Sequence, residues 1–132
     1  MAELSAYMED RIVNFMRNTA ITGEAAAYVA LFTDSASLAG LEAGTLTGEV
    51  SGGSYARELA GLSAPSGGVS ANASDITFPT ATGDWGAVTY VALMDADSAG
   101  NVLMYSALDT PKTVASGDTF KISAGDLYVT IS

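Results

Sequence analysis

The chain has 132 residues and a mass of 13.4 kDa, which suits one domain with a sizeable core. Apolar residues make up 48% of it and charged residues 15%, so the chain is too apolar to be intrinsically disordered. Its net charge of −10 argues against nucleic acid or an anionic membrane surface as the main partner, because both require clustered Lys and Arg.

The chain contains no Cys and no His, and these absences narrow its chemistry. Without Cys there is no disulfide framework, zinc–thiolate site or cysteine nucleophile. Without His the usual general base and the Ser–His–Asp triad are missing. We therefore predict a protein that is not an enzyme and uses no cofactor. Because no apolar run has membrane-span length and the start is acidic, we also expect synthesis in the cytoplasm and no membrane partner.

Residues 1–22 form the first predicted unit, an amphipathic helix of about four turns that ends near Asn18. Its apolar side chains recur at three- and four-residue steps and share one stripe: Leu4, Met8, Ile12, Phe15 and Met16. Two placements are open. The stripe covers an open face or end of the same domain, or it packs on a neighbouring subunit, with Leu4, Met8 and Ile12 as contacts.

Residues 23–132 form the second predicted unit, and their pattern is β. The run 26–33 is apolar almost throughout, which predicts a central strand buried on both faces. Segments 34–48 and 60–74 are predicted loops, the first with at most one helical turn. Further strands are expected at 49–59, 75–79, 87–95, 102–108, 119–123 and 127–131.

Together these elements predict a mainly β fold in one domain. Seven or eight short strands at spacings near ten residues, separated by Gly and Ser, are typical of a single antiparallel β-sandwich or barrel. The N-terminal amphipathic helix is an addition to that fold.

An oxygen-rich loop at 95–101 raises the question of a Ca²⁺ site. Asp95, Asp97 and Asn101 could supply ligands, but the twelfth position counted from Asp95 is Ser106 where an EF-hand has Glu. Strands are also expected on both sides of the loop. We therefore interpret the segment as a turn that its own Asp and Asn side chains cap.

Three side chains are candidate interface anchors because aromatic residues and Arg dominate interface hot spots: Tyr55, Arg57 and Trp85. Arg57 is one of five basic residues in an acidic chain, so we expect a carboxylate partner within the chain or across a subunit boundary. Trp85 is the only Trp, at the junction of a polar loop and an apolar strand. It can anchor that loop at the core edge, fill an interface or stack on a sugar ring.

Four segments together resemble a family of small structural proteins of tailed-bacteriophage virions, whose members are labelled tail fibre or capsid decoration proteins. They are YVALFT at 28–33, EVSGGSYAR at 49–57, ITFPTATGDWG at 76–86 and TVASGDTFKISAGDLYVTI at 113–131. The resemblance runs over nearly the whole chain. It implies a non-enzymatic virion component that forms an oligomer.

On this basis the first expectation is a capsid decoration or cement protein that stabilises the head through lattice contacts. A tail-fibre or other tail-associated subunit is the second, and a carbohydrate-binding adhesion module that uses Trp85 is the third. The expected partners are copies of the chain, with a homotrimer by analogy to other phage surface proteins, and the major capsid protein or other virion proteins. The expected location is the virion, assembled in the host cytoplasm.

Overall fold

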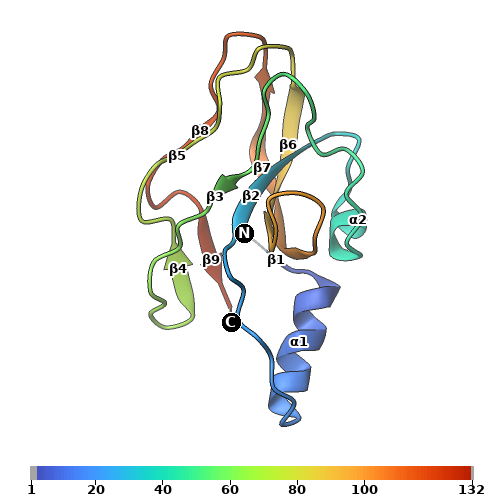
Figure 1. Ribbon diagram of the computed structural model, residues 1–132, viewed down its shortest axis with the longest axis vertical. Coiled ribbons are helices and arrows are strands. Elements are labelled where there is room, and N and C mark those ends of the chain that lie inside the picture. The colour runs from blue at the N-terminus through green and yellow to red at the C-terminus, as the bar shows by residue number, and fades with distance from the viewer. Residues whose placement is uncertain (1–2, 132) are drawn as a thin grey trace.

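The computed structural model describes residues 3–131, which form three antiparallel sheets and two helices (Figure 1). The helices are α1 (Ala6–Met16) and α2 (Leu38–Glu42). The strands are β1 (Glu3–Leu4), β2 (Tyr28–Thr33), β3 (Glu58–Leu59), β4 (Val69–Ala71), β5 (Ile76–Thr77), β6 (Gly86–Met94), β7 (Val102–Val114), β8 (Lys121–Ile122) and β9 (Tyr128–Thr130). Neither helix is long and apolar enough to cross a membrane.

The main sheet has five strands in the order β1-β7-β6-β2-β3, with β6 and β2 at its centre. The alternation of side chains along a strand sends Val29 and Leu31 of β2 to one face, and Ala30 and Phe32 to the other. All four are fully buried. The predicted central strand with two buried faces is therefore confirmed.

One face of the main sheet packs against a second layer made of the pairs β5–β8 and β4–β9 and the loops between them. Aromatic side chains fill this interface. Phe78 follows β5, and its ring meets Phe120 edge-on at 5.6 Å between centroids and stacks on Tyr55 at 6.4 Å. This core gives a sandwich-like molecule and not a closed barrel, which resolves the predicted alternatives in favour of the sandwich.

The other face of the main sheet is covered by α2 and the segment around it. Leu41 of α2 is fully buried against Phe32 and Met94, in a second cluster that also contains Tyr105. Ser37 caps this short helix by accepting a hydrogen bond from the Gly40 amide at 3.0 Å. The single helical turn predicted within 34–48 is confirmed.

The predicted strand set is confirmed in outline, with four differences. Most of the strand expected at 49–59 is absent, because a turn at Gly52–Gly53 interrupts the segment, leaving an isolated bridge at Glu49 and the short β3 at its end. β1 lies where the helix was expected to begin, and β4 lies within the expected loop 60–74. β7 extends to Val114, beyond the expected end at residue 108, because the strand resumes its pairing with β6 at Lys112 after residues 108–111 bulge out. β1 and β4 have only two and three residues, so their pairing partners define them, and no local periodicity does.

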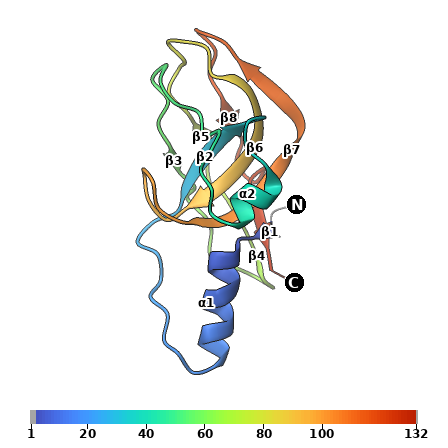
Figure 2. The same cartoon turned by 90° about the vertical axis from the view of Figure 1, so that its right-hand side faces the viewer.

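The N-terminal helix is shorter than predicted and projects from one end of the sandwich (Figure 2). Ser5 determines where it begins. The Ser5 hydroxyl accepts a hydrogen bond from the Met8 amide at 3.2 Å and donates to the Val102 carbonyl, while the Ser5 amide donates to the Leu103 carbonyl. The predicted exit is confirmed at Asn18, which has a positive φ of 65°.

Candidate functional site

Arg57 is buried and fully engaged within the chain. Its Nε and one terminal nitrogen each donate to a Glu49 carboxylate oxygen at 2.7 Å, and its other terminal nitrogen donates to the carbonyls of Ala96 and Ala99 at 2.7 and 2.8 Å. The side chain therefore ties the segment before β3 to the loop that joins β6 and β7. The hydrogen bonds that Arg57 donates to Glu49 raise the pKa of Arg57 above its ordinary value. The predicted carboxylate partner exists, and it is intramolecular.

Tyr55 completes this polar cluster. Its hydroxyl donates to Glu49 Oε2 at 2.9 Å and accepts a hydrogen bond from the Leu31 amide at 3.1 Å. Burial, which disfavours the phenolate, raises the pKa of Tyr55 well above its ordinary value. The Glu49 carboxylate thus accepts three charge-assisted hydrogen bonds, which is how its charge is accommodated beside the core.

Trp85 is 5% exposed and anchors the loop that precedes β6. Its indole N–H donates to the Gly53 carbonyl at 2.9 Å, and its ring meets Tyr55 edge-on at 5.4 Å between centroids. Gly53 has a positive φ of 56°, and a Cβ there would lie 2.9 Å from the indole nitrogen, so the close approach requires glycine. The interpretation of Trp85 as a core-edge anchor is confirmed.

Tyr55, Arg57 and Trp85 therefore lie together, in one network that stabilises the sandwich. Their polar groups already have partners within the chain. That these residues contact another subunit stays a prediction.

The predicted helix contacts divide into two groups. Leu4 and Met8 are partly buried against the main core, and Ile12 is half-buried. Farther along the helix, Phe15 is 64% exposed and Met16 is 70% exposed. Among the residues of α1, all of which the structure describes, none is buried. The distal half of the stripe is therefore the part that does not pack on the sandwich. The sequence pattern did not reveal this division, because the apolar spacing continues without a break along the helix.

Arg11 holds the distal half of α1 to the chain that returns toward β2. Its guanidinium lies 5.2 Å from the centre of the Tyr7 ring and donates to the Tyr7 hydroxyl at 3.1 Å. It also forms an ion pair with Glu24 at 3.1 Å and donates to the Thr22 carbonyl. The projecting helix is thus fixed at its base by Ser5 and at its middle by Arg11.

The loop at 95–101 closes on itself, as predicted. The two carboxylate oxygens of Asp95 accept hydrogen bonds from the amide and the side-chain nitrogen of Asn101, at 2.7 and 2.9 Å. Within residues 3–131, no group of three acidic side chains is placed to hold a metal ion.

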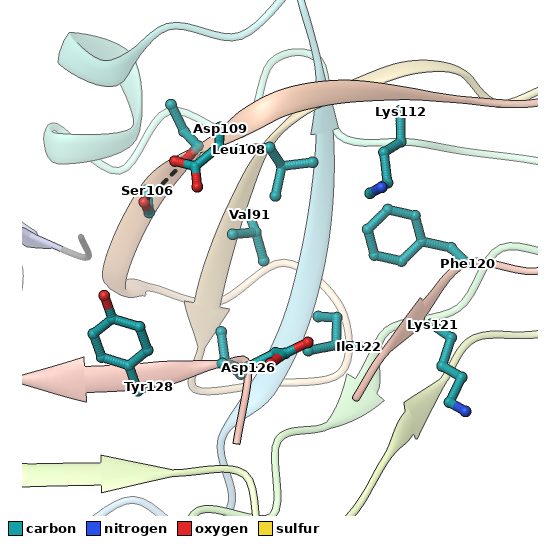
Figure 3. A pocket seen from close by; sticks show the side chains of 12 residues that line it. Val91, Ser106, Leu108, Asp109, Lys112, Phe120, Lys121, Ile122, Asp126 and Tyr128 are labelled. Carbon is teal, nitrogen blue, oxygen red and sulfur yellow. Dashed lines mark hydrogen bonds between the residues drawn. The ribbon is translucent and has the colours of Figure 1, made fainter. Parts of the chain in front are cut away.

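A groove of about 310 Å³ lies between β7 and the strands β8 and β9 (Figure 3). Its apolar lining is Val91, Leu108, Phe120, Ile122 and Leu127, and its rim carries Asp109, Lys112, Lys121, Asp126 and Tyr128. Sequence reasoning missed this groove because β7, β8 and β9, although consecutive in sequence, each pair with a different strand (β6, β5 and β4). Their side chains meet only in the folded sandwich, and the bulge at 108–111 shapes one wall. Such a lining can take a ligand with both apolar and polar faces.

Tyr105 connects the main sheet to two carboxylates. Its hydroxyl lies 3.1 Å from a Glu3 carboxylate oxygen and 3.3 Å from one of Glu42, so the two acids compete for one phenolic proton. Burial, with a further contribution from the hydrogen bond to Glu3, raises the pKa of Tyr105 to about 12. Sequence reasoning did not single out this residue, because its partners belong to β1 and α2.

This environment predicts a loss of stability in alkali. A tyrosine side chain in an unfolded chain ionises at about pH 10. Between that pH and about 12, Tyr105 in the folded state therefore keeps a proton that it has lost in the unfolded state. Stability contributed by Tyr105 is therefore complete below pH ~10 and falls as the pH rises further. Urea unfolding at increasing pH measures this. Tyr105→Phe should reduce the alkaline loss, whereas Tyr128→Phe, at a side chain 52% exposed, should leave it unchanged.

A family model described as podophage GP4 fiber I protein gp80 matches residues 3–130 of the chain. No curated protein sequence matches the chain.

Proposed function

The chain belongs to the podophage GP4 fiber I protein gp80 family, and on that premise we propose that it is a non-enzymatic structural subunit of a phage fibre. The match over residues 3–130 carries the proposal, because it covers both the projecting helix and the sandwich. A phage fiber protein is a virion component, which agrees with the expected location. Assembly in the host cytoplasm is part of the proposal.

The family description favours the second expectation, a tail fibre, over the first, a capsid decoration protein. The arrangement of the polar side chains supports a structural role. Hydrogen bonds hold loops and strands of the same chain together, and they are made by Arg57, Glu49 and Tyr55. The Trp85 N–H makes another such bond within the chain. These groups build a rigid sandwich, which is what a load-transmitting subunit needs.

We propose that the partners are copies of this chain and other virion proteins. Closed cyclic symmetry is the usual arrangement of homo-oligomers, and a trimer is the arrangement we expect. The adhesion-module alternative is weakened, because the ring of Trp85 packs against Tyr55 inside the molecule and is 5% exposed. A sugar-stacking role would need an accessible aromatic face.

Immunogold labelling of intact phage particles tests the proposal. We expect an antibody against the purified chain to label the tail fibres, and quantitative mass spectrometry to find few copies relative to the major capsid protein. Dense label over the head, with a copy number near that of the capsid subunit, would instead support decoration. Absence of the chain from purified particles would contradict both virion roles.

A further inference from the structure

We propose that the distal end of α1 is the surface on which a second copy of this chain docks. The surface, called the α1 tip here, consists of the exposed apolar side chains Val13, Phe15, Met16 and Ile21. This inference rests on the proposed function, in which copies of the chain assemble into a fibre. It moves the expected helix contact from Leu4, Met8 and Ile12 to the opposite end of the same helix.

The first argument is exposure. Met16 and Phe15 are the two most exposed large hydrophobic side chains among the described residues, at 70% and 64%. Val13 and Ile21, at 48% and 39%, extend the same apolar end. Both views show α1 extending away from the sheets, so the tip stands clear of its own domain (Figures 1 and 2). Val13 and Phe15 point to nearly opposite sides of the helix, so the apolar side chains surround its end, and exposed apolar surface at a projecting end marks an interaction site.

The second argument is that the helix is built to hold its shape. An isolated helix of 11 residues is marginal in water. Here the Ser5 cap fixes its start, and Arg11 joins its middle to Tyr7, Thr22 and Glu24. The helix that carries the tip is therefore held from its start to its middle, which reduces the ordering of the chain that docking requires.

The third argument is charge, and it selects the partner. Residues 5–23 carry two acidic side chains, Glu9 and Asp10, and two basic ones, Arg11 and Arg17, so this segment is neutral. The whole net charge of −10 therefore lies on the rest of the chain. A basic partner would be drawn to that acidic remainder. The neutral helix is where two copies of an acidic chain can meet with the least repulsion.

Sedimentation analysis of two matched double variants tests this inference. Phe15→Gln with Met16→Gln keeps good helix formers while removing the apolar contact. We expect self-association to weaken at least about a hundredfold, since two side chains lose their burial. The control, Leu59→Gln with Tyr128→Gln, alters two side chains that lie away from the α1 tip and are 59% and 52% exposed. It should leave self-association unchanged. Circular dichroism checks that both variants keep their fold.

Salt and cysteine trapping give independent readouts. Salt should strengthen the association of the native chain, because it screens the repulsion between two acidic bodies. Because the chain has no Cys, Met16→Cys introduces a unique thiol that should form an intermolecular disulfide, while Leu59→Cys should not.

Two outcomes would overturn the inference: a native chain that stays monomeric at millimolar concentration, or self-association that survives the tip variant. In the second case, failure of the tip variant to enter particles would assign the tip to another virion protein. Immunogold label on the fibres in either of these cases leaves the proposed function standing.

Discussion

Replacing Arg57 with Ala is expected to reduce the free energy of unfolding by about 3–5 kcal/mol. The change leaves the Glu49 carboxylate, which is only 19% exposed, without its counter-charge. It also removes the donor that the Ala96 and Ala99 carbonyls share. A buried charge without its counter-charge is costly because the interior solvates it poorly. Urea unfolding followed by circular dichroism measures the loss.

The same chain offers a matched control for this prediction. Lys121 and Asp75 also form an ion pair, at 3.0 Å, but both side chains are about half exposed, at 50% and 49%. Solvent and salt screen such a pair, so Lys121→Ala should leave the unfolding midpoint almost unchanged. Equal effects of Arg57→Ala and Lys121→Ala would show that the Arg57 cluster contributes no more than a surface pair.

A double replacement separates charge from hydrogen bonding. Arg57→Met with Glu49→Leu removes both charges, and apolar replacement of a buried ion pair is often neutral or stabilising. Here we expect only partial recovery relative to Arg57→Ala, because the Ala96 and Ala99 carbonyls and the Tyr55 hydroxyl still lose partners. Full recovery would mean that these hydrogen bonds contribute little.

The Arg57 cluster also shows how far sequence reasoning can reach. A lone Arg in an acidic chain predicts a carboxylate partner, and the apolar run at β2 predicts a strand buried on both faces. Both follow from local composition and periodicity. Local composition does not predict which of the 15 acidic side chains pairs with Arg57. Glu49 and the 96–99 loop meet only when β2, β6 and β7 are assembled.

The same limit applies to the candidate surfaces. The α1 stripe is readable from its three- and four-residue spacing, but the split into a docked base and a free tip depends on β1 pairing with β7 at Tyr105 and Met104. The groove beside Tyr128 depends on a bulge between residues 107 and 112, where the β6–β7 register shifts. Strand pairing creates these features: β1 pairs with β7 beside the helix, and the groove walls β7, β8 and β9 pair with β6, β5 and β4.

Trp85→Ala is expected to cost about 3–5 kcal/mol of stability, as large-to-small core changes at aromatic positions do. The ring packs edge-on against Tyr55, and its N–H donates to the Gly53 carbonyl. Truncation therefore leaves a cavity and removes one of the two hydrogen bonds that this carbonyl accepts, the other coming from the Thr82 amide. Trp85→Phe keeps most of the volume but removes the donor, and should cost about 1–2 kcal/mol. Thermal and urea unfolding followed by circular dichroism measure both, since the chain holds no second Trp for fluorescence.

This pair of variants also decides between the core and interface interpretations of Trp85. If its main role is inside the sandwich, the loss appears in the free energy of unfolding, and the folded fraction of Trp85→Phe associates with other copies as tightly as the native chain. An anchor at a subunit boundary would give the opposite result: a small change in unfolding and a marked loss of self-association. Because the side chain is 5% exposed, we expect the first result, and the second would mean that the surface around Gly53 opens when subunits meet.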